Sequence, residues 1–280
     1  MNSIYHFFKE LYQLRNNFLS ENKLEDFPFP QSMIACVNKG TFPDLAIKLN
    51  VGNSEFTGGE LIELKDSKSN IVSSFNSTIP TGTKEISKII GGPNSTIRKQ
   101  MQEAGNNIES LPVRDVFYLV RGRKREHTKV VLVHGSFFET VNSDSLISKS
   151  FLQAFREMLH ESDVRMPNKL KKLFNKLTFG HENFSRVRDV ENASVKLRFR
   201  IMTEVKHEGN ILNEEKYPQI EDDTLNLLLP YHNKKELEQI ENKFNSVFDE
   251  ASRNKFVSLN VKHHFNGYYK TFQTSLINTD

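Results

Sequence analysis

The chain has 280 residues, a formal net charge of +3 at pH 7 and a mean hydropathy of −0.54. Its single cysteine, Cys36, excludes an intrachain disulfide framework and a cysteine-rich zinc site. No apolar run approaches the roughly 20 residues of a membrane-spanning helix, and the first residues lack a signal-peptide pattern, so we expect a cytoplasmic protein. The pI near 8.7 is compatible with a nucleic-acid partner.

The first part of the chain combines one helical pattern with several short apolar runs. Apolar residues recur at helical spacing from Ile4 to Leu19, which predicts a helix. Met33 to Val37 predicts a short strand. Leu45 to Leu49 and Glu60 to Lys65 are separated by a segment with three Gly and two Asn, and this pattern predicts a hairpin.

The middle of the chain predicts two helices followed by two strands. Thr83 has the chemistry of an N-cap for a helix that ends at Ile90, before Gly91-Gly92-Pro93. Asn94 or Ser95 begins a second helix that runs to Ala104-Gly105. Val116 to Val120 and Lys129 to Val133 are apolar strands. The fold expected is α/β, with a mixed central sheet flanked by helices.

Beyond residue 140 the pattern changes. It predicts helices at 146–159, 168–177 and 234–251, and strands at 195–205 and 256–261. We therefore expect a core over residues 1–140 and a more helical C-terminal half over residues 141–280, which is either a separate unit or part of the same domain.

Three ionisable residues of the hairpin are expected to meet at one end of the sheet. Glu63 and Lys65 share a face because side chains alternate along a strand, and pairing across the hairpin can bring Asp44 beside Glu63. Leu64 should then point to the opposite face, into apolar packing. Two carboxylates and an amine suit a divalent-metal site for phosphodiester hydrolysis. The alternative is a solvent-facing hairpin with a weak Glu63–Lys65 ion pair.

Pro43-Asp44, followed after eighteen residues by Glu63-Leu64-Lys65, resembles the signature of the PD-(D/E)xK nucleases. The small polar residues that follow resemble those of type II restriction endonucleases, and the resemblance covers residues 30–135. It implies a restriction-endonuclease-like core in which Asp44, Glu63 and Lys65 are catalytic. Asp44, Glu63 and the backbone carbonyl of Leu64 would bind Mg²⁺, with Mn²⁺ as a substitute.

The same resemblance implies a homodimer that cuts double-stranded DNA at a specific sequence, as the endonuclease of a restriction-modification system. The region 141–280 would then serve dimerisation or DNA recognition. The alternatives are a repair or mobile-element nuclease with the same signature, and a non-catalytic DNA-binding or structural protein.

Two sets of residues are candidates for contact with DNA. Each set can instead be an ordinary solvated loop or hairpin tip. The first follows the second strand of the hairpin, and the second links the two later strands: Lys68, Ser73, Asn76, Ser77, Thr78 and Thr81, then Arg121, Arg123, Lys124 and Arg125.

The Glu-x-Lys triplet occurs five times in the chain, so only its context has meaning. Asp189 with Glu204 and Lys206 is a second complete candidate for the nuclease signature. Asp66-Ser67-Lys68 is a shifted match that follows the strand rather than lying within it.

Overall fold

A computed structural model describes most of the chain outside its middle. The residues described are 3–37, 42–48, 59–72, 74–76, 80–86, 96–106, 108–139 and 202–277, together with 149–150, 152–154, 157–158, 167–169 and 172. Most of the helices expected at 146–159 and 168–177, and most of the strand expected at 195–205, lie outside these residues.

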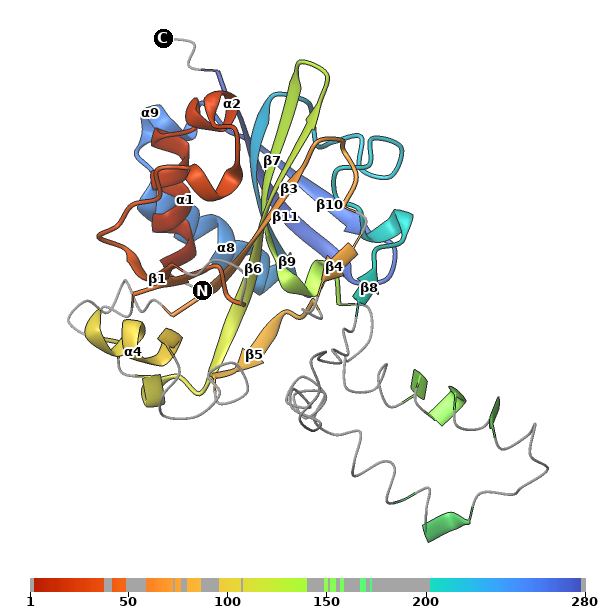
Figure 1. The fold of residues 1–280 in the computed structure, drawn as a ribbon. Helices are drawn as coiled ribbons and strands as arrows, with labels where there is room; N and C mark the ends of the chain where they lie inside the picture. The colour runs from red at the N-terminus through yellow and green to blue at the C-terminus, as the bar shows by residue number, and fades with distance from the viewer. Residues whose placement is uncertain are drawn as a thin grey trace.

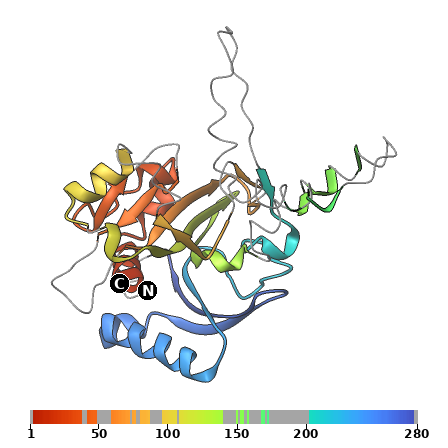
Figure 2. The same ribbon diagram turned by 90° about the horizontal axis from the view of Figure 1, so that it is seen from below.

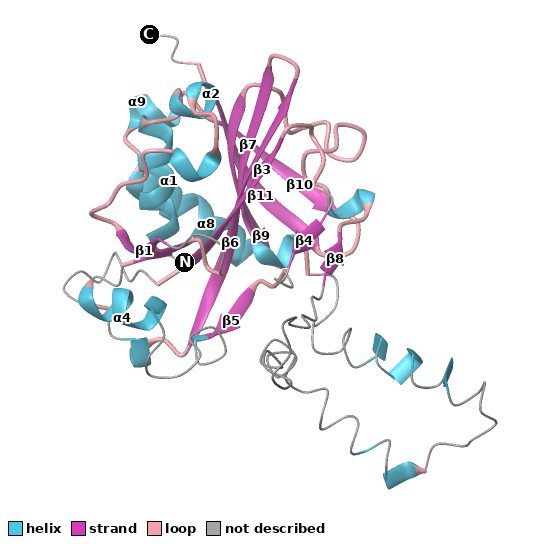
Figure 3. Cartoon of the chain, viewed as in Figure 1, coloured by secondary structure: helices cyan, strands magenta, loops and turns pink. Residues whose placement is uncertain are grey.

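A mixed sheet of nine strands, counted over the described residues, runs through the middle of the molecule (Figure 3). Its order is β1 (Ile34–Val37), β2 (Leu45–Ile47), β3 (Leu61–Ser67), β6 (Val113–Lys124), β7 (His127–His134), β9 (Thr224–Tyr231), β11 (Gly267–Ser275) and β10 (Val257–His263), with β5 (Thr83–Glu85) paired to the start of β6. The pairs β3–β6 and β7–β9 are parallel and the others antiparallel. The expectation of an α/β fold with a mixed sheet is confirmed.

Helices cover one face of this sheet. α1 (Ser3–Gln13) and α8 (Lys234–Val247) contact each other, and they lie with α2 (Asn17–Ser20) and α9 (Glu250–Arg253) on the same side of the strands (Figure 1). Their apolar side chains pack on the β3 and β6 residues Ile62, Leu64, Phe117 and Leu119. The helical stripe expected from Ile4 to Leu19 is present, but it is divided into α1 and α2 by a turn.

The opposite face is covered by α4 (Thr96–Glu103) and by the segment 211–220. α4 and α8 therefore lie on opposite sides of the strands (Figure 2). Val116, Tyr118 and Val120 of β6 belong to this second apolar cluster. Because both faces of the central strands are buried, the middle of β6, Val116 to Val120, is a continuous apolar run.

The first three residues of the helix expected from Thr83 to Ile90 form a strand instead, while Ile86 is helical. Thr83–Glu85 forms β5, which pairs antiparallel with Val113–Asp115 of β6. The N-cap chemistry of Thr83 is a local preference, and the backbone partners offered by the long strand β6 override it. Residues 87–95 lie outside the described part of the chain.

The described part of the second half is not mainly helical. β9, β10 and β11 extend the sheet of the first half through the parallel pair β7–β9. The strand expected at 256–261 is present as β10, whereas β9 and β11 had no counterpart in the sequence prediction. A small separate sheet joins β4 (Ser74–Asn76) to β8 (Met202–Glu204). In the described residues, no helix combines the length and the apolar character needed to cross a bilayer.

Candidate active site on the β2–β3 hairpin

The register of the hairpin brings Asp44 to Glu63. Leu45 pairs with Ile62 and Ala46 with Leu61, so the next position of the ladder sets Asp44 opposite Glu63. The carboxylate of Asp44 does not turn away, because its Oδ2 accepts the backbone N–H of Leu64 at 2.8 Å. This hydrogen bond fixes Asp44, the residue just before β2, against the edge of β3.

The carboxyl groups of Asp44 and Glu63 interact directly. Burial, and then the neighbouring charge of Glu63, raise the pKa of Asp44 to about 7, and a hydrogen bond between the two side chains contributes to the rise. Glu63 is only 6% exposed. Because two carboxylates can hydrogen-bond only when they share a proton, the pair holds either a proton or another cation at neutral pH.

Lys65 lies on the same face as Glu63, as expected. Its Nζ is 2.9 Å from Glu63 Oε1 and 5.4 Å from the centre of the Phe75 ring. The Lys65 side chain is 23% exposed, against 8% for that of Glu63. The amine therefore lies between the buried carboxylates and the surface.

Leu64 takes part in the site through its backbone and not through its side chain. The side chain packs in the apolar cluster under α1, on the face opposite Glu63, as expected. In a strand the N–H and C=O of one residue point to the same side. The carbonyl of Leu64 therefore lies on the edge that carries its N–H, which is the edge bound by Asp44.

This arrangement offers two carboxylates and one backbone oxygen to a cation. No group of three or more His, Cys, Asp or Glu suited to a metal is present among the described residues. Mg²⁺ does not need one, since it is commonly held by one or two carboxylates and keeps several waters. Glu63 Oε2 is buried and receives no hydrogen bond of good geometry from the described residues. An unpaired buried oxygen of this kind fits a hard cation.

Aromatic residues that the sequence prediction did not identify surround the pair. Tyr118 is the register partner of Glu63 across β3–β6 and is fully buried. Its ring contacts Phe75 and Phe138 edge-on. Burial, and then the charge of Glu63, raise the pKa of Tyr118 well above its usual value. Tyr118 reaches the site because β3 and β6, which are about 50 residues apart in the sequence, pair in parallel. No local pattern in the sequence predicts this pairing.

Arg121, a predicted DNA contact, is buried in an ion pair with Asp66. It is fully buried and forms two bonds to Asp66, Nε–Oδ1 at 2.9 Å and Nη2–Oδ2 at 2.6 Å. Its Nη1 donates to the carbonyls of Phe18 and Glu21. The guanidinium therefore has no free edge for a phosphate. Asp66 is likewise occupied, so the shifted match Asp66-Ser67-Lys68 is not a second metal motif.

The rest of the basic cluster lies at the β6–β7 turn, away from the carboxylate pair. Arg123 donates to the carbonyl of Asn22 at 2.8 Å and shares the Arg121 face of β6, opposite Glu63. Lys124 contacts Glu214 at 3.1 Å. Arg125 is exposed at the turn, with φ of 58°. Of the four basic residues predicted to contact DNA, Arg121 is fully buried and Arg123 lies on the face of β6 opposite Glu63, so neither adjoins the carboxylate pair.

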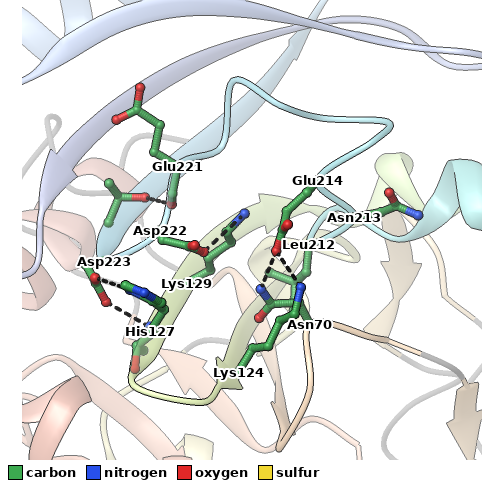
Figure 4. Close-up of polar contacts among 12 residues, drawn as sticks. Asn70, Lys124, His127, Lys129, Leu212, Asn213, Glu214, Glu221, Asp222 and Asp223 are labelled. Atoms are coloured by element: carbon green, nitrogen blue, oxygen red, sulfur yellow. Dashed lines mark hydrogen bonds and ion pairs between the residues drawn. The ribbon is translucent and has the colours of Figure 1, made fainter.

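Acidic residues of the segment 214–223 meet the β6–β7 hairpin. Figure 4 shows Lys124 and Asn70 turned toward Glu214, and His127 toward Asp223. Lys129, only 2% exposed, reaches Asp222 at 3.4 Å. These contacts tie the second half of the chain to the hairpin and leave the turn less basic than its own sequence suggests.

The other predicted DNA contacts are only partly described. Lys68 is exposed just beyond β3. The Thr81 hydroxyl is within hydrogen-bond distance of Thr83 O and Glu139 Oε2. Asn76 belongs to β4 by its backbone, and Ser73, Ser77 and Thr78 lie outside the described residues.

The second candidate signature is not assembled in the described part of the chain. Glu204 ends β8 and is exposed, as is Lys206, and Asp189 lies outside the described residues. A cavity of about 800 Å³ adjoins Glu204, but its lining includes none of the hairpin residues Asp44, Glu63 and Lys65. Charges of both signs line it, among them Lys124, Glu204, Lys206 and Glu214.

Comparison of the chain with models of protein families, with curated proteins and with solved structures gives no match. The functional argument therefore rests on the geometry of the hairpin and on the residues that form it.

Proposed function

We propose that this chain is a Mg²⁺-dependent endonuclease that hydrolyses double-stranded DNA at specific sequences, as a type II restriction enzyme with a PD-(D/E)xK core. The observation that carries the proposal is the direct interaction of Asp44 with Glu63 beside Lys65. A strand that only packed in a core would not favour a buried carboxylate pair, because each charge loses hydration without gaining a cation.

Asp44, Glu63 and the Leu64 carbonyl are the groups that would hold Mg²⁺, with Mn²⁺ as a substitute. All are hard oxygen donors, and no His or Cys is needed. The bound ion would supply Lewis-acid stabilisation of the phosphate and a water of lowered pKa. Until it binds, the raised pKa of Asp44 lets a proton partly occupy the same position.

Lys65 is the residue proposed to act on the water and the phosphate. Its Nζ carries three donors, and Glu63 Oε1 engages it at 2.9 Å. The Lys65 side chain is 23% exposed, so its remaining donors would be able to hold a phosphate oxygen or an attacking water. The same amine neutralises part of the charge that accumulates on the scissile phosphate.

The substrate proposed is duplex DNA with a two-fold symmetric sequence, read by a homodimer, because a symmetric site is matched by a symmetric protein. Lys68, Lys124 and Arg125 are the exposed cations of the predicted set that remain available for phosphates. Lys124 would have to exchange Glu214 for a phosphate.

Plasmid digestion with Mg²⁺ or with EDTA tests the proposal. Discrete fragments support a restriction enzyme, a smear supports a less specific nuclease with the same signature, and unchanged DNA supports a binding or structural protein. Glu63→Gln and Lys65→Ala should each abolish cleavage. The matched controls are Glu204→Gln and Lys206→Ala, which alter an exposed triplet of the same spacing and should leave cleavage intact.

Cleavage that survives Glu63→Gln but is lost in Glu204→Gln would move the active site to the second candidate. Efficient cleavage in EDTA would end the metal mechanism.

A further inference from the structure

The hydroxyl of Tyr118 is a buried polar group that the mechanism above does not use. Tyr118 and Glu63 are direct partners in the parallel β3–β6 register, so their side chains lie next to each other on one face of the sheet. Tyr118 is 0% exposed. Its position beside the carboxylate pair is therefore set by strand pairing rather than by a mobile loop.

Packing fixes the ring of Tyr118. Phe75 approaches it at 5.1 Å and Phe138 at 5.0 Å, both edge to face. The Thr81 backbone is close enough to form a weak, poorly aligned hydrogen bond with the hydroxyl, and the charges of Glu63 and Glu139 act on it. Even so, no hydrogen bond of good geometry to the hydroxyl is found among the described residues.

Two buried oxygens without such a partner, Tyr118 Oη and Glu63 Oε2, thus belong to side chains that are neighbours on one face of the sheet. Buried polar groups in folded proteins are normally hydrogen-bonded, and unpaired ones call for an explanation such as a bound ion or water. A phenylalanine would fill the same space between Phe75 and Phe138 without that cost. The hydroxyl therefore points to a ligand that both oxygens serve.

We propose that Tyr118 is a positioning residue of the cation site, whose hydroxyl holds an ordered water bound between it and the ion carried by Asp44 and Glu63. This inference rests on the proposed function. Residues that hydrogen-bond to the ligands of a metal, without touching the metal, set the orientation of those ligands. Loss of such a residue commonly weakens metal binding roughly 10-fold or more. Tyr118 would act through that water and not on the DNA itself.

The composition of the chain allows a direct optical test. It contains no Trp and seven Tyr, so a tyrosine is the only strong sensitiser of Tb³⁺ luminescence. Tb³⁺ is a hard cation that prefers oxygen ligands, as Ca²⁺ does. A tyrosine adjacent to the bound ion transfers its excitation to Tb³⁺, and distant tyrosines do so poorly.

The variants are Tyr118→Phe and, as a matched control, Tyr269→Phe. Tyr269 is also fully buried on the same face of the sheet but belongs to β11, four strands from β3 and therefore roughly 19 Å away. Each variant removes one hydroxyl and keeps the ring. Tb³⁺ emission that Mg²⁺ displaces is measured first, and Mg²⁺ affinity is then measured by titration calorimetry.

We expect Tyr118→Phe to lose most of the Mg²⁺-displaceable emission and to bind Mg²⁺ roughly 10-fold more weakly, with Tyr269→Phe close to the wild type. The metal-free Tyr118→Phe protein should melt at the wild-type temperature or above, because an unpaired buried hydroxyl has been removed. A purely structural role predicts the reverse, a lower melting temperature with unchanged Mg²⁺ affinity.

Retained emission or unchanged Mg²⁺ affinity in Tyr118→Phe would overturn the role of Tyr118 and leave the cation site standing. If the wild type gives no emission that Mg²⁺ displaces, and Glu63→Gln changes nothing, the cation site fails and the role of Tyr118 fails with it. The two failures are therefore distinguishable.

Discussion

Replacing Asp66 by Ala should destabilise the protein far more than any change at the exposed β6–β7 turn. The substitution leaves the guanidinium of Arg121 fully buried, with the carbonyls of Phe18 and Glu21 as its remaining partners. It also removes the acceptor of the Leu24 N–H, which lies 3.1 Å from Asp66 Oδ2.

The expected loss follows from burial and geometry. Removing one partner of a fully buried ion pair costs about 3–5 kcal/mol, because the other charge stays in the interior. The Asp66 side chain is 17% exposed and that of Arg121 0%, so the expected loss lies toward the lower end of this range. A typical domain has a free energy of unfolding of about 5–15 kcal/mol, so the loss is a large fraction of the total. The double variant Asp66→Leu/Arg121→Met should be less destabilised than Asp66→Leu alone, since it removes both charges together.

Urea unfolding at neutral pH measures these differences, with Arg125→Ala as the control. Arg125 is exposed at the turn, and its loss should change the free energy of unfolding by no more than about 0.5 kcal/mol. The reasoning would be refuted if Asp66→Ala kept wild-type stability while Arg121→Met weakened DNA binding and reduced its dependence on salt. Arg121 would then be a phosphate contact, as the sequence first suggested.

Three further predictions concern the site and its frame. Burial raises the pKa of Asp44 to about 7, above an unfolded value of about 3.9. Its contribution to stability is therefore fully present below about pH 4 and is lost as the pH rises through about 7. Metal-free protein should lose stability from this group between about pH 4 and about pH 7. Asp44→Asn should show less of this loss, and a wild-type slope in the variant would contradict the assignment. Lys65→Ala should reduce the cleavage rate, measured in single-turnover assays, by about 100-fold or more. Its affinity for DNA in Ca²⁺, measured by gel shift, should change little. A matching loss of affinity would make Lys65 a binding residue. Gly135→Ala should cost about 1–3 kcal/mol or more in thermal unfolding, because its Cβ would lie 2.0 Å from the Thr81 carbonyl oxygen, and an unchanged melting temperature would show that this approach relaxes freely.

The hairpin could be predicted from sequence because its signals are local. Short apolar runs define both strands, and the Gly and Asn residues lie between them. The period of two sets Glu63 and Lys65 on one face. The position of Asp44 follows from the same pairing, since the ladder needs only one more step beyond Leu45–Ile62.

The parallel register of β3 and β6 could not be predicted in this way. It pairs Glu63 with Tyr118 and Asp66 with Arg121, residues 55 positions apart in each case. One non-local fact thus adds Tyr118 to the site and converts Arg121 from a candidate phosphate contact into a buried ion pair. The sequence shows that four basic residues lie close together, but not which of them face the interior: Arg121, Arg123, Lys124 and Arg125.

Tertiary pairing also decided the elements that the sequence pattern missed. Thr83 carries a helix-capping side chain, yet β6 extends far enough to pair with Thr83–Glu85. β9 is buried between two strands and lacks the alternation of a half-exposed strand, and Pro230 near its end argues against a strand by local rules.

The most direct test of the central claim is to sequence the DNA ends left by the wild type in Mg²⁺, beside those from Glu63→Gln. The account predicts that the wild-type ends share one short symmetric sequence and that Glu63→Gln leaves the DNA intact while remaining folded. Intact DNA with the wild type in both Mg²⁺ and Mn²⁺, or the same ends from Glu63→Gln, would contradict it.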